Sequence, residues 1–221
     1  MRAALLNGSP RGSRSTSRAM GSYALEGLRS RGWAVEELDM CRAVTTSEGL
    51  TDLLALAERS DLMILSFPTY FDSPPAAVIR AMETMHSRIR KGGDLLAIEN
   101  CGYVRSGNNS PSLSICRLFA RDIGWEWRGG LSLGGGNVLA GHGLEEAGGV
   151  ARNVRKALDQ AVLALAEGKA VPQEAIDLLG RNIVPPFLHN TRANRAWDRA
   201  ARKNNVLDRI RDRPYMEEES R

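Results

Sequence analysis

A run of small, hydroxyl-bearing and basic residues near the N-terminus offers the donors that a phosphate group needs. Five hydroxyl side chains lie between Ser9 and Ser17, and Arg11 and Arg14 stand among them. The run follows a short apolar segment, residues 3–6, and precedes an amphipathic one, so we expect it to join a strand to the start of a helix. The N-terminus of a helix attracts anions through its N–H groups and its dipole.

The glycine spacing in this run favours a single phosphate over a pyrophosphate. Gly8 and Gly12 are four residues apart and no third glycine completes a Gly-x-Gly-x-x-Gly turn, nor does the run contain the Gly-Lys-Ser/Thr of a P-loop. We therefore predict a site for a terminal phosphate monoester. The residues predicted to hold it are Ser9, Arg11, Ser15, Thr16 and Ser17. An ordinary helix cap by Ser15 or Thr16, beside a solvated basic loop, is the simpler alternative.

A second loop carries two aromatic residues between prolines. It follows the most apolar segment of the chain, residues 61–67, and begins with Pro68, Thr69, Tyr70 and Phe71. Proline restricts the backbone, so such a loop can be stiff enough to hold a flat ring against an aromatic side chain. The alternative is that the two aromatics close the end of the sheet as part of the core.

A third loop follows the next predicted strand and begins with Asn100, Cys101, Gly102 and Tyr103. Its glycine frees backbone N–H groups for hydrogen bonds to a ligand, although a flexible connection fits the sequence equally well. A glycine-rich stretch, residues 129–143, either borders a second ligand or forms a mobile loop.

Short apolar segments alternate with amphipathic ones over the first 165 residues. We predict strands over residues 3–6, 33–38, 61–67, 94–99 and 126–133, and helices over residues 16–31, 50–59, 75–90, 113–123 and 145–166. Strict alternation of this kind indicates an α/β fold with a parallel sheet covered by helices on both faces. We expect the strand at 61–67 to be central and the strand at 33–38 to lie near an edge. Ligands bind such sheets beyond the carboxyl ends of the strands, where the three loops should meet.

Composition excludes several classes of protein. The 221 residues are 43% hydrophobic and 25% charged, which is typical of a globular protein and not of a collagen or a wholly disordered chain. The longest apolar runs are far shorter than the ~20 residues of a membrane span, and the first residues are too few for a signal-peptide core. We therefore expect a cytoplasmic protein with no membrane partner. Three widely spaced cysteines, Cys41, Cys101 and Cys116, indicate neither a disulfide framework nor a metal site.

The last fifty residues differ from the rest. They contain no predicted strand, a Pro185-Pro186 joint and a basic helix over residues 190–203. Between Arg181 and Arg213 nine Lys and Arg residues face three Asp residues, a local charge of +6. Such a charge can attract an anionic partner, but no nucleic-acid motif accompanies it, so we expect a solvated helix face and no nucleic acid. We divide the chain into a domain, residues 1–168, and a helical extension, residues 169–221, that packs on the domain or on a second subunit.

Three motifs together resemble one known family, the flavodoxin-like NAD(P)H-dependent FMN reductases and their oxidoreductase relatives. The motifs are Gly8-Ser9-Pro10-Arg11, Ser15-Thr16-Ser17, and Pro68-Thr69-Tyr70 after the strand at 61–67. The likeness covers about residues 2 to 165. It implies a flavodoxin-like three-layer sandwich with five parallel strands in the order 2-1-3-4-5, one bound FMN, NADH or NADPH as co-substrate, and a homodimer or homotetramer.

The resemblance also implies a role for each loop. The first would hold the FMN phosphate; Pro68, Thr69, Tyr70 and Phe71 would line the ribityl chain and ring; Asn100, Cys101, Gly102 and Tyr103 would meet the polar edge of the ring. The implied activity passes electrons from NAD(P)H through the flavin to a small acceptor such as a quinone or free flavin, with no catalytic acid or base required of the protein.

Two other functions fit the same sequence. One is a non-catalytic electron carrier or flavin-dependent sensor that docks a partner through the basic C-terminal helices. The other is a phosphoester-binding protein without flavin. Iron–sulfur relatives carry a compact cysteine cluster near the end of the second strand, whereas Cys41 stands alone, so no cluster of four thiolates is expected.

Overall fold

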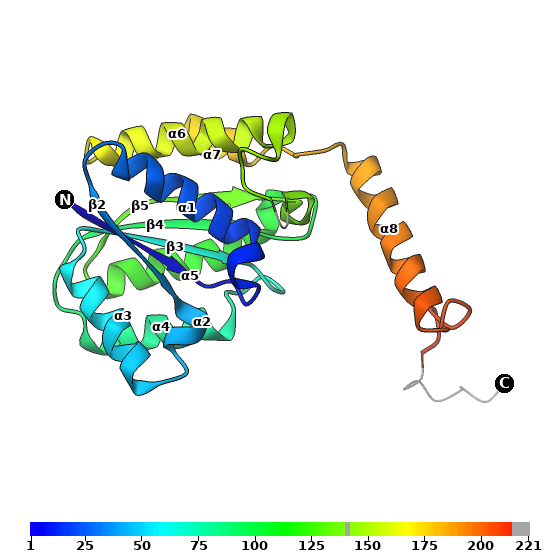
Figure 1. The fold of residues 1–221 in the computed structure, drawn as a ribbon, viewed down its shortest axis with the longest axis horizontal. Coiled ribbons are helices and arrows are strands. Elements are labelled where there is room, and N and C mark those ends of the chain that lie inside the picture. The colour runs from blue at the N-terminus through cyan, green and yellow to red at the C-terminus, as the bar shows by residue number, and fades with distance from the viewer. Residues whose placement is uncertain (140–141, 214–221) are drawn as a thin grey trace. The chain divides into compact units, whose positions relative to one another are not determined.

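Five parallel strands form one sheet in the order β2-β1-β3-β4-β5, as expected (Figure 1). The computed structural model describes residues 1–139 and 142–213. The strands are β1 (Arg2–Asn7), β2 (Ala34–Asp39), β3 (Leu62–Pro68), β4 (Asp94–Asn100) and β5 (Glu126–Leu133). No strand differs from its predicted bounds by more than one residue at either end.

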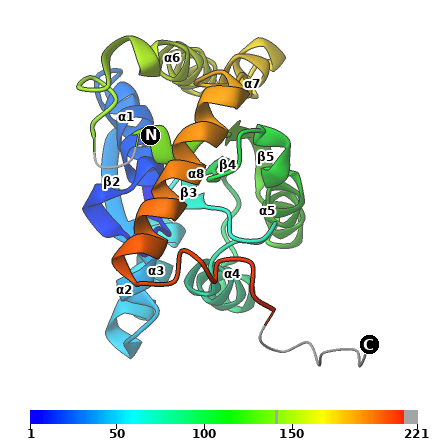
Figure 2. The ribbon, with the colours of Figure 1, turned by 90° about the vertical axis from the view of Figure 1, so that its right-hand side faces the viewer.

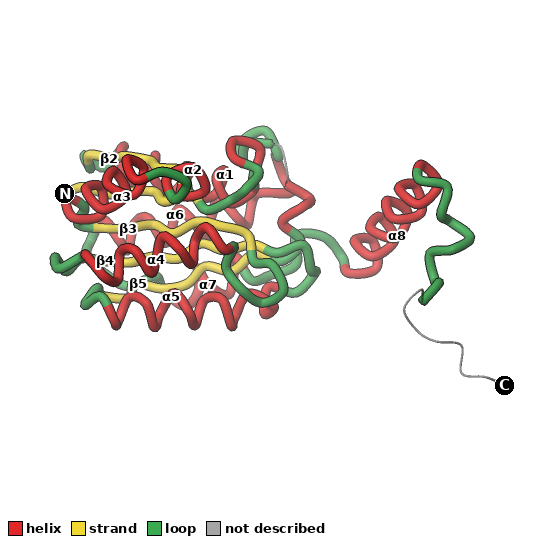
Figure 3. The backbone as a smooth tube through the Cα atoms, turned by 90° about the horizontal axis from the view of Figure 1, so that it is seen from below, coloured by secondary structure: helices red, strands yellow, loops and turns green. Residues whose placement is uncertain are grey.

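Helices cover both faces of the sheet, because side chains of successive strand residues point to opposite faces. In β1, Ala3 and Leu5 join one apolar cluster, and Ala4 and Leu6 join the other. On the first face lie α1 (Thr16–Arg29) and α6 (Arg152–Ala166); on the second lie α2 (Met40–Ala43), α3 (Ser47–Arg59), α4 (Ala76–Arg88) and α5 (Ser110–Asp122). Figure 3 shows α3, α4 and α5 lying across their face of the strands.

The predicted positions of two strands in the sheet are confirmed. Strand β3 is central, and its residues from Leu62 to Phe67 are all buried. Strand β2 is an edge strand, and none of its six residues is fully buried. The other edge, β5, is partly covered, since the N–H of Val171 donates to the carbonyl of Arg128 at 2.7 Å.

The helix predicted over residues 145–166 is wrong in its first turns. A short 3-10 turn, η4 (Gly148–Ala151), precedes α6, which begins only at Arg152. Gly148 has a φ of +56°, which an α-helix cannot contain, so the two adjacent glycines stop the helix from extending further back. Val150 is 46% exposed instead of joining the buried stripe of α6.

The chain divides into two compact units, residues 1–183 and 184–221. A short helix, α7 (Gln173–Leu179), belongs to the first unit because its Ala175 and Leu179 are buried in the same cluster as α6 (Figures 1 and 2). The second unit contains the predicted basic helix, α8 (Pro186–Lys203), with Pro185 before its first residue. Among the described residues, no helix has the length and apolar character needed to cross a membrane.

Candidate functional site

A cavity of about 260 Å³ lies where the carboxyl ends of β1, β3 and β4 meet. Its wall is formed by the three loops that sequence analysis singled out. The lining includes every predicted binding residue, namely Ser9, Arg11, Ser15, Thr16, Ser17, Pro68, Thr69, Tyr70, Phe71, Asn100, Cys101, Gly102 and Tyr103. Two residues that were not predicted, Gly136 and Asn137, complete it.

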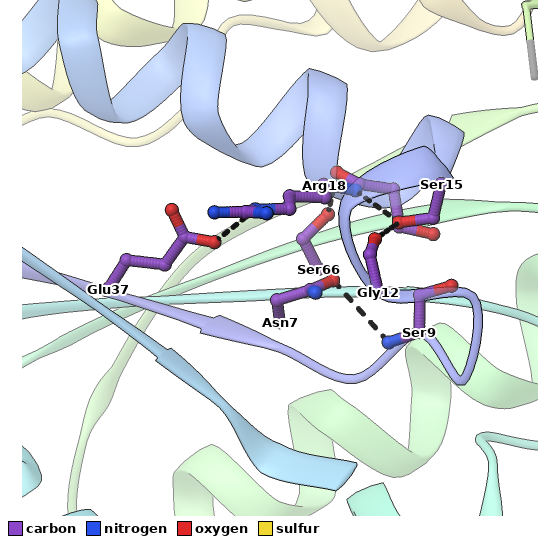
Figure 4. A network of polar contacts seen from close by, with 8 residues as sticks. Asn7, Ser9, Gly12, Ser15, Arg18, Glu37 and Ser66 are labelled. Carbon is purple, nitrogen blue, oxygen red and sulfur yellow. Dashed lines mark hydrogen bonds and ion pairs between the residues drawn. The ribbon is translucent and has the colours of Figure 1, made fainter. Parts of the chain in front are cut away.

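The first loop is fixed by hydrogen bonds at both ends. After β1, the N–H of Gly8 donates to the carbonyl of Ser66 at 2.9 Å, which attaches the turn to the central strand. The N–H of Ser9 donates to Asn7 Oδ1 at 3.4 Å (Figure 4). Gly12, with a φ of +55°, reverses the chain so that its N–H reaches the Ser9 carbonyl at 3.0 Å. The loop therefore delivers the N-terminus of α1 to the cavity.

The helix cap that was the simpler alternative is present. Ser15 is the N-cap of α1: its Oγ accepts from the N–H of Arg18 at 3.1 Å, and its own hydroxyl donates to the Gly12 carbonyl at 2.9 Å (Figure 4). A cap needs only one hydroxyl, however, and the next two face the cavity. The cap and the wall of the cavity are therefore built at the same helix end.

The hydroxyls of Thr16 and Ser17 join the first loop to the rest of the wall. Thr16 Oγ1 donates to the Gly136 carbonyl at 2.7 Å, and Ser17 Oγ donates to Asn100 Oδ1 at 3.1 Å. Both residues are buried. A phosphate oxygen would have to compete for these hydroxyl protons, so the positive end of the helix and Arg11 are the groups best placed to attract it.

Basic side chains around the loop have different partners. Arg18 pairs with Glu37 on β2, with 2.6 Å between Nε and Oε1 (Figure 4). Arg11 lines the cavity, whereas Arg14, only three residues later, does not. Arg11 is therefore the basic side chain in the described lining.

The second loop presents its aromatic side chains to solvent. Tyr70 is 45% exposed and Phe71 is 91% exposed, so the alternative that they close the core is wrong. Backbone hydrogen bonds between Tyr70 and Ser73 close a tight turn, in which Phe71 and Asp72 have φ values of +47° and +65°. Non-glycine residues rarely adopt this conformation, and such strain is often found at binding sites.

The third loop is attached to the chain segment after β5. The N–H of Gly136 donates to the Cys101 carbonyl at 2.8 Å, and the N–H of Gly135 donates to the Tyr103 carbonyl at 2.6 Å. These bonds hold the loop in place, which does not fit a merely flexible connection. None of the described residues accepts a hydrogen bond from the N–H groups of Gly102 or Tyr103. Those N–H groups are available to a ligand.

The glycine-rich stretch contributes the wall residues that sequence analysis did not assign. A short turn, η3 (Gly136–Leu139), brings Gly136 against Asn100, where a Cβ would lie 3.0 Å from the asparagine side chain. The abundance of glycine was the available signal, but it could not distinguish a wall from a mobile loop. Part of this stretch, residues 140–141, lies outside the described residues.

The chemistry of the cysteines is limited by burial. Burial raises the pKa of the Cys101 thiol above its ordinary value, so this wall residue stays neutral at physiological pH. Burial and, less strongly, Asp39 raise the pKa of Cys41. Over residues 1–139 and 142–213, no cluster of three or more His, Cys, Asp or Glu side chains could hold a metal ion.

The fold and cavity define a class: an α/β protein with a cavity at the carboxyl edge of a 2-1-3-4-5 sheet, built around a helix N-terminus. Residues 1–109 match the sequence model of the NADPH-dependent FMN reductases. The chain belongs to this family, which confirms the resemblance noted in its motifs. No curated protein matches the chain significantly in sequence.

Solved structures confirm the flavodoxin-like fold. An NADH:FMN oxidoreductase in its apo form is similar over 85% of this chain and 98% of its own, with a TM-score of 0.58 and 15% identity. An FMN-dependent NADH-azoreductase from Bacillus anthracis, solved with FMN, is similar over 75% and 99%, with a TM-score of 0.53 and 13% identity. A flavodoxin from Streptococcus pneumoniae is similar over 76% and 99%, with a TM-score of 0.53 and 15% identity.

Proposed function

We propose that this protein binds FMN in the cavity and passes electrons from NADH or NADPH through it to a small acceptor. The observation that carries the proposal is the combination of groups around one cavity. The N-terminus of α1 and Arg11 suit a phosphate, whereas Tyr70, Phe71 and Tyr103 suit a planar ring. Phosphate and ring are the two ends of a flavin mononucleotide.

The residues present fit FMN in chemistry and approximately in size. Ser9, Arg11, Ser15, Thr16 and Ser17 would hold the phosphate, and the loop that starts at Pro68 would line the ribityl chain and the ring. Ligand cavities usually measure about 300–1,000 Å³, and this one, at about 260 Å³, is slightly smaller. FMN would therefore extend from the cavity over the exposed aromatic rim, leaving part of the ring open to a second substrate.

Bound FMN would supply the hydride chemistry, and the protein would supply orientation and electrostatics. The N–H groups of Gly102 and Tyr103 would stabilise negative charge at the polar edge of the ring, as donors do in an oxyanion hole. Cys101 would contribute a neutral wall, since its thiol is not ionised at physiological pH.

Titration with FMN tests the first step of the proposal. We expect the flavin fluorescence to change with saturation at micromolar protein. Anaerobic addition of NADH or NADPH should then bleach the blue absorption of the bound flavin, and adding a quinone or free flavin should restore it. Bound FMN without turnover would favour the electron carrier or sensor. A protein that binds inorganic phosphate but no flavin would favour the phosphoester-binding alternative.

A further inference from the structure

A carboxyl group lies buried directly behind the cavity wall. Glu99, the sixth residue of β4, has no exposed surface. Its Oε2 accepts a hydrogen bond from Thr69 Oγ1 at 3.0 Å, and Thr69 lines the cavity. A single hydroxyl group therefore separates this carboxyl from a ligand in the site.

Among the residues that the structure describes, Glu99 has no basic partner. From α5, the Cys116 thiol donates to Oε1 at 3.5 Å, and within the described part of the chain Glu99 forms no ion pair. Cys101, another titratable group that interacts with Glu99, is itself acidic. On this face of the sheet, α4 contributes apolar side chains, among them Val78, Ala81 and Met82. Burial raises the pKa of Glu99 to about 7, and its hydrogen bonds oppose that rise.

A neighbouring hydroxyl can accept a hydrogen bond from a protonated Glu99. Ser112, on α5, lies beside the carboxyl and has no exposed surface. Its Oγ forms no well-aligned hydrogen bond within the described residues. A neutral Glu99 could donate to this oxygen or to Thr69 Oγ1, whereas an ionised Glu99 can only accept.

We propose that the proton on Glu99 determines whether Thr69 donates or accepts a hydrogen bond in the cavity, and so tunes the affinity of the site for a flavin ring. When Glu99 is ionised, the Thr69 proton is committed to the carboxylate, and only the Thr69 oxygen remains for a ligand. When Glu99 is neutral, the Thr69 proton is released and can point into the cavity. This positioning role rests on the proposed function.

The direction of the effect follows from the ligand. An oxidised flavin ring carries acceptors at N1, O2, O4 and N5 and a single N–H at N3, so it favours a donor in the wall. Flavin should bind more tightly when Glu99 is neutral, and binding should take up protons near pH 7. One net hydrogen bond changes an affinity by about 5-fold.

Riboflavin affinity at pH 6.0 and pH 8.0 tests the proposal. Riboflavin is the probe because it lacks the phosphate of FMN. A phosphate monoester has a second pKa of about 6 and would add a pH dependence of its own. Among the described lining residues there is no histidine to add a second titration. We expect the wild-type affinity to fall about 3-fold between these pH values, because a carboxyl with a pKa of about 7 is not fully converted at either pH. Glu99→Gln, which is neutral at both, should bind equally well at both.

Substitutions at the hydroxyl separate this role from general damage to the site. Thr69→Val keeps the shape of the side chain but removes the hydroxyl, so riboflavin should bind more weakly and without pH dependence. Thr69→Ser should restore the pH dependence. Wild-type pH dependence in Glu99→Gln or Thr69→Val, or equal wild-type affinity at both pH values, would overturn the proposal even if flavin binds.

A measurement on the flavin-free protein separates this proposal from the proposed function. In the infrared spectrum, the wild-type minus Glu99→Gln difference should contain the carbonyl band of a protonated carboxyl, which disappears as pH rises through about 7. Absence of this band at pH 6 overturns the switch. If the band titrates but neither riboflavin nor FMN binds, the proposed function fails, and with it the coupling to a flavin.

Discussion

At the scale of single residues, Arg11 provides a direct test of the phosphate end of the site. Charge-assisted hydrogen bonds contribute about 1.5–3 kcal/mol, so Arg11→Ala should weaken FMN binding about tenfold or more. Riboflavin has no phosphate, and its affinity should not change. Fluorescence titrations with both ligands measure the difference.

Arg14 is the matched control for Arg11. It is exposed, has the same charge, lies three residues away and does not line the cavity. Arg14→Ala should therefore leave the affinities for both flavins close to those of the wild type. Equal losses for the two variants would mean that the general positive charge of the loop, and not Arg11 in the cavity, attracts the ligand.

Glu99 should make the stability of the protein depend on pH. Its pKa is about 7 in the folded chain, against an ordinary 4.5. Between these values the folded state holds a proton that the unfolded state has lost, so the free energy of unfolding falls as pH rises from 4.5 to 7. The full difference amounts to about 3 kcal/mol. The free energy of unfolding of Glu99→Gln should therefore fall less between pH 5 and pH 8 than that of the wild type. Urea unfolding at the two pH values would measure the difference.

An exposed glutamate provides the control for this pH effect. Glu126 is at the start of the neighbouring strand β5 and is exposed. Glu126→Gln should follow the wild-type dependence of unfolding free energy on pH. If Glu99→Gln follows it too, the buried carboxyl does not change its protonation on folding.

The sequence could identify residues that follow strands but not those that reach the site from elsewhere. Tyr70 and Cys101 were predictable because the carboxyl ends of parallel strands meet at one edge. Asn137 was not, because its position depends on how the chain turns after β5. Glu99 directly follows the apolar run 95–98 of its strand, which is a visible signal, but the sequence does not show that Thr69 is its partner.

At the scale of elements, the turn between β1 and α1 depends on close packing against α4. A Cβ built on Gly8 would lie 2.2 Å from Val78 Cγ2 and 3.1 Å from Phe67 Cβ. Val78 is fully buried at the start of α4, so the turn must move away from it. Gly8→Ala should lower the free energy of unfolding by about 1–3 kcal/mol and weaken FMN binding, because the displaced turn carries the N-terminus of α1.

Gly107 is the control for Gly8. A Cβ at Gly107 would meet no atom within 4 Å, its φ is not positive, and it does not line the cavity. Gly107→Ala should leave both the thermal unfolding midpoint and the FMN affinity near the wild-type values. A Gly8→Ala variant as stable as Gly107→Ala would show that Val78 repacks without moving the turn.

Elements with a strong apolar period were predictable, and those governed by local backbone geometry were not. Strand β3, which the notably apolar segment at residues 61–67 predicted, agrees with the structure to within one residue at either end. The start of α6 was missed because the apolar stripe suggested a longer helix than the paired glycines at 148–149 permit. Helix α7 has only seven residues, too few for a clear period.

At the scale of the whole molecule, every residue of the cavity lies in the first compact unit. The sheet, both apolar clusters and the wall of the site are complete within residues 1–183. The second unit presents a different surface. Phe187 and Trp197 of α8 are 73% and 70% exposed. Most of the Lys and Arg residues between Arg181 and Arg213 lie on the same helix. Phe and Trp are enriched at protein–protein interfaces relative to the rest of protein surfaces.

We therefore expect that residues 184–221 join copies of the chain and are not needed for folding or flavin binding. A chain of residues 1–183 should keep the circular dichroism spectrum and FMN affinity of the full protein, whereas its mass in light scattering should fall from that of a dimer or tetramer to that of a monomer. Trp197→Ala in the full chain should weaken the oligomer without removing the helix. A full chain that is already a monomer, or a truncated chain that keeps the same number of subunits, would contradict this role, and loss of FMN binding on truncation would mean that the second unit contributes to the site.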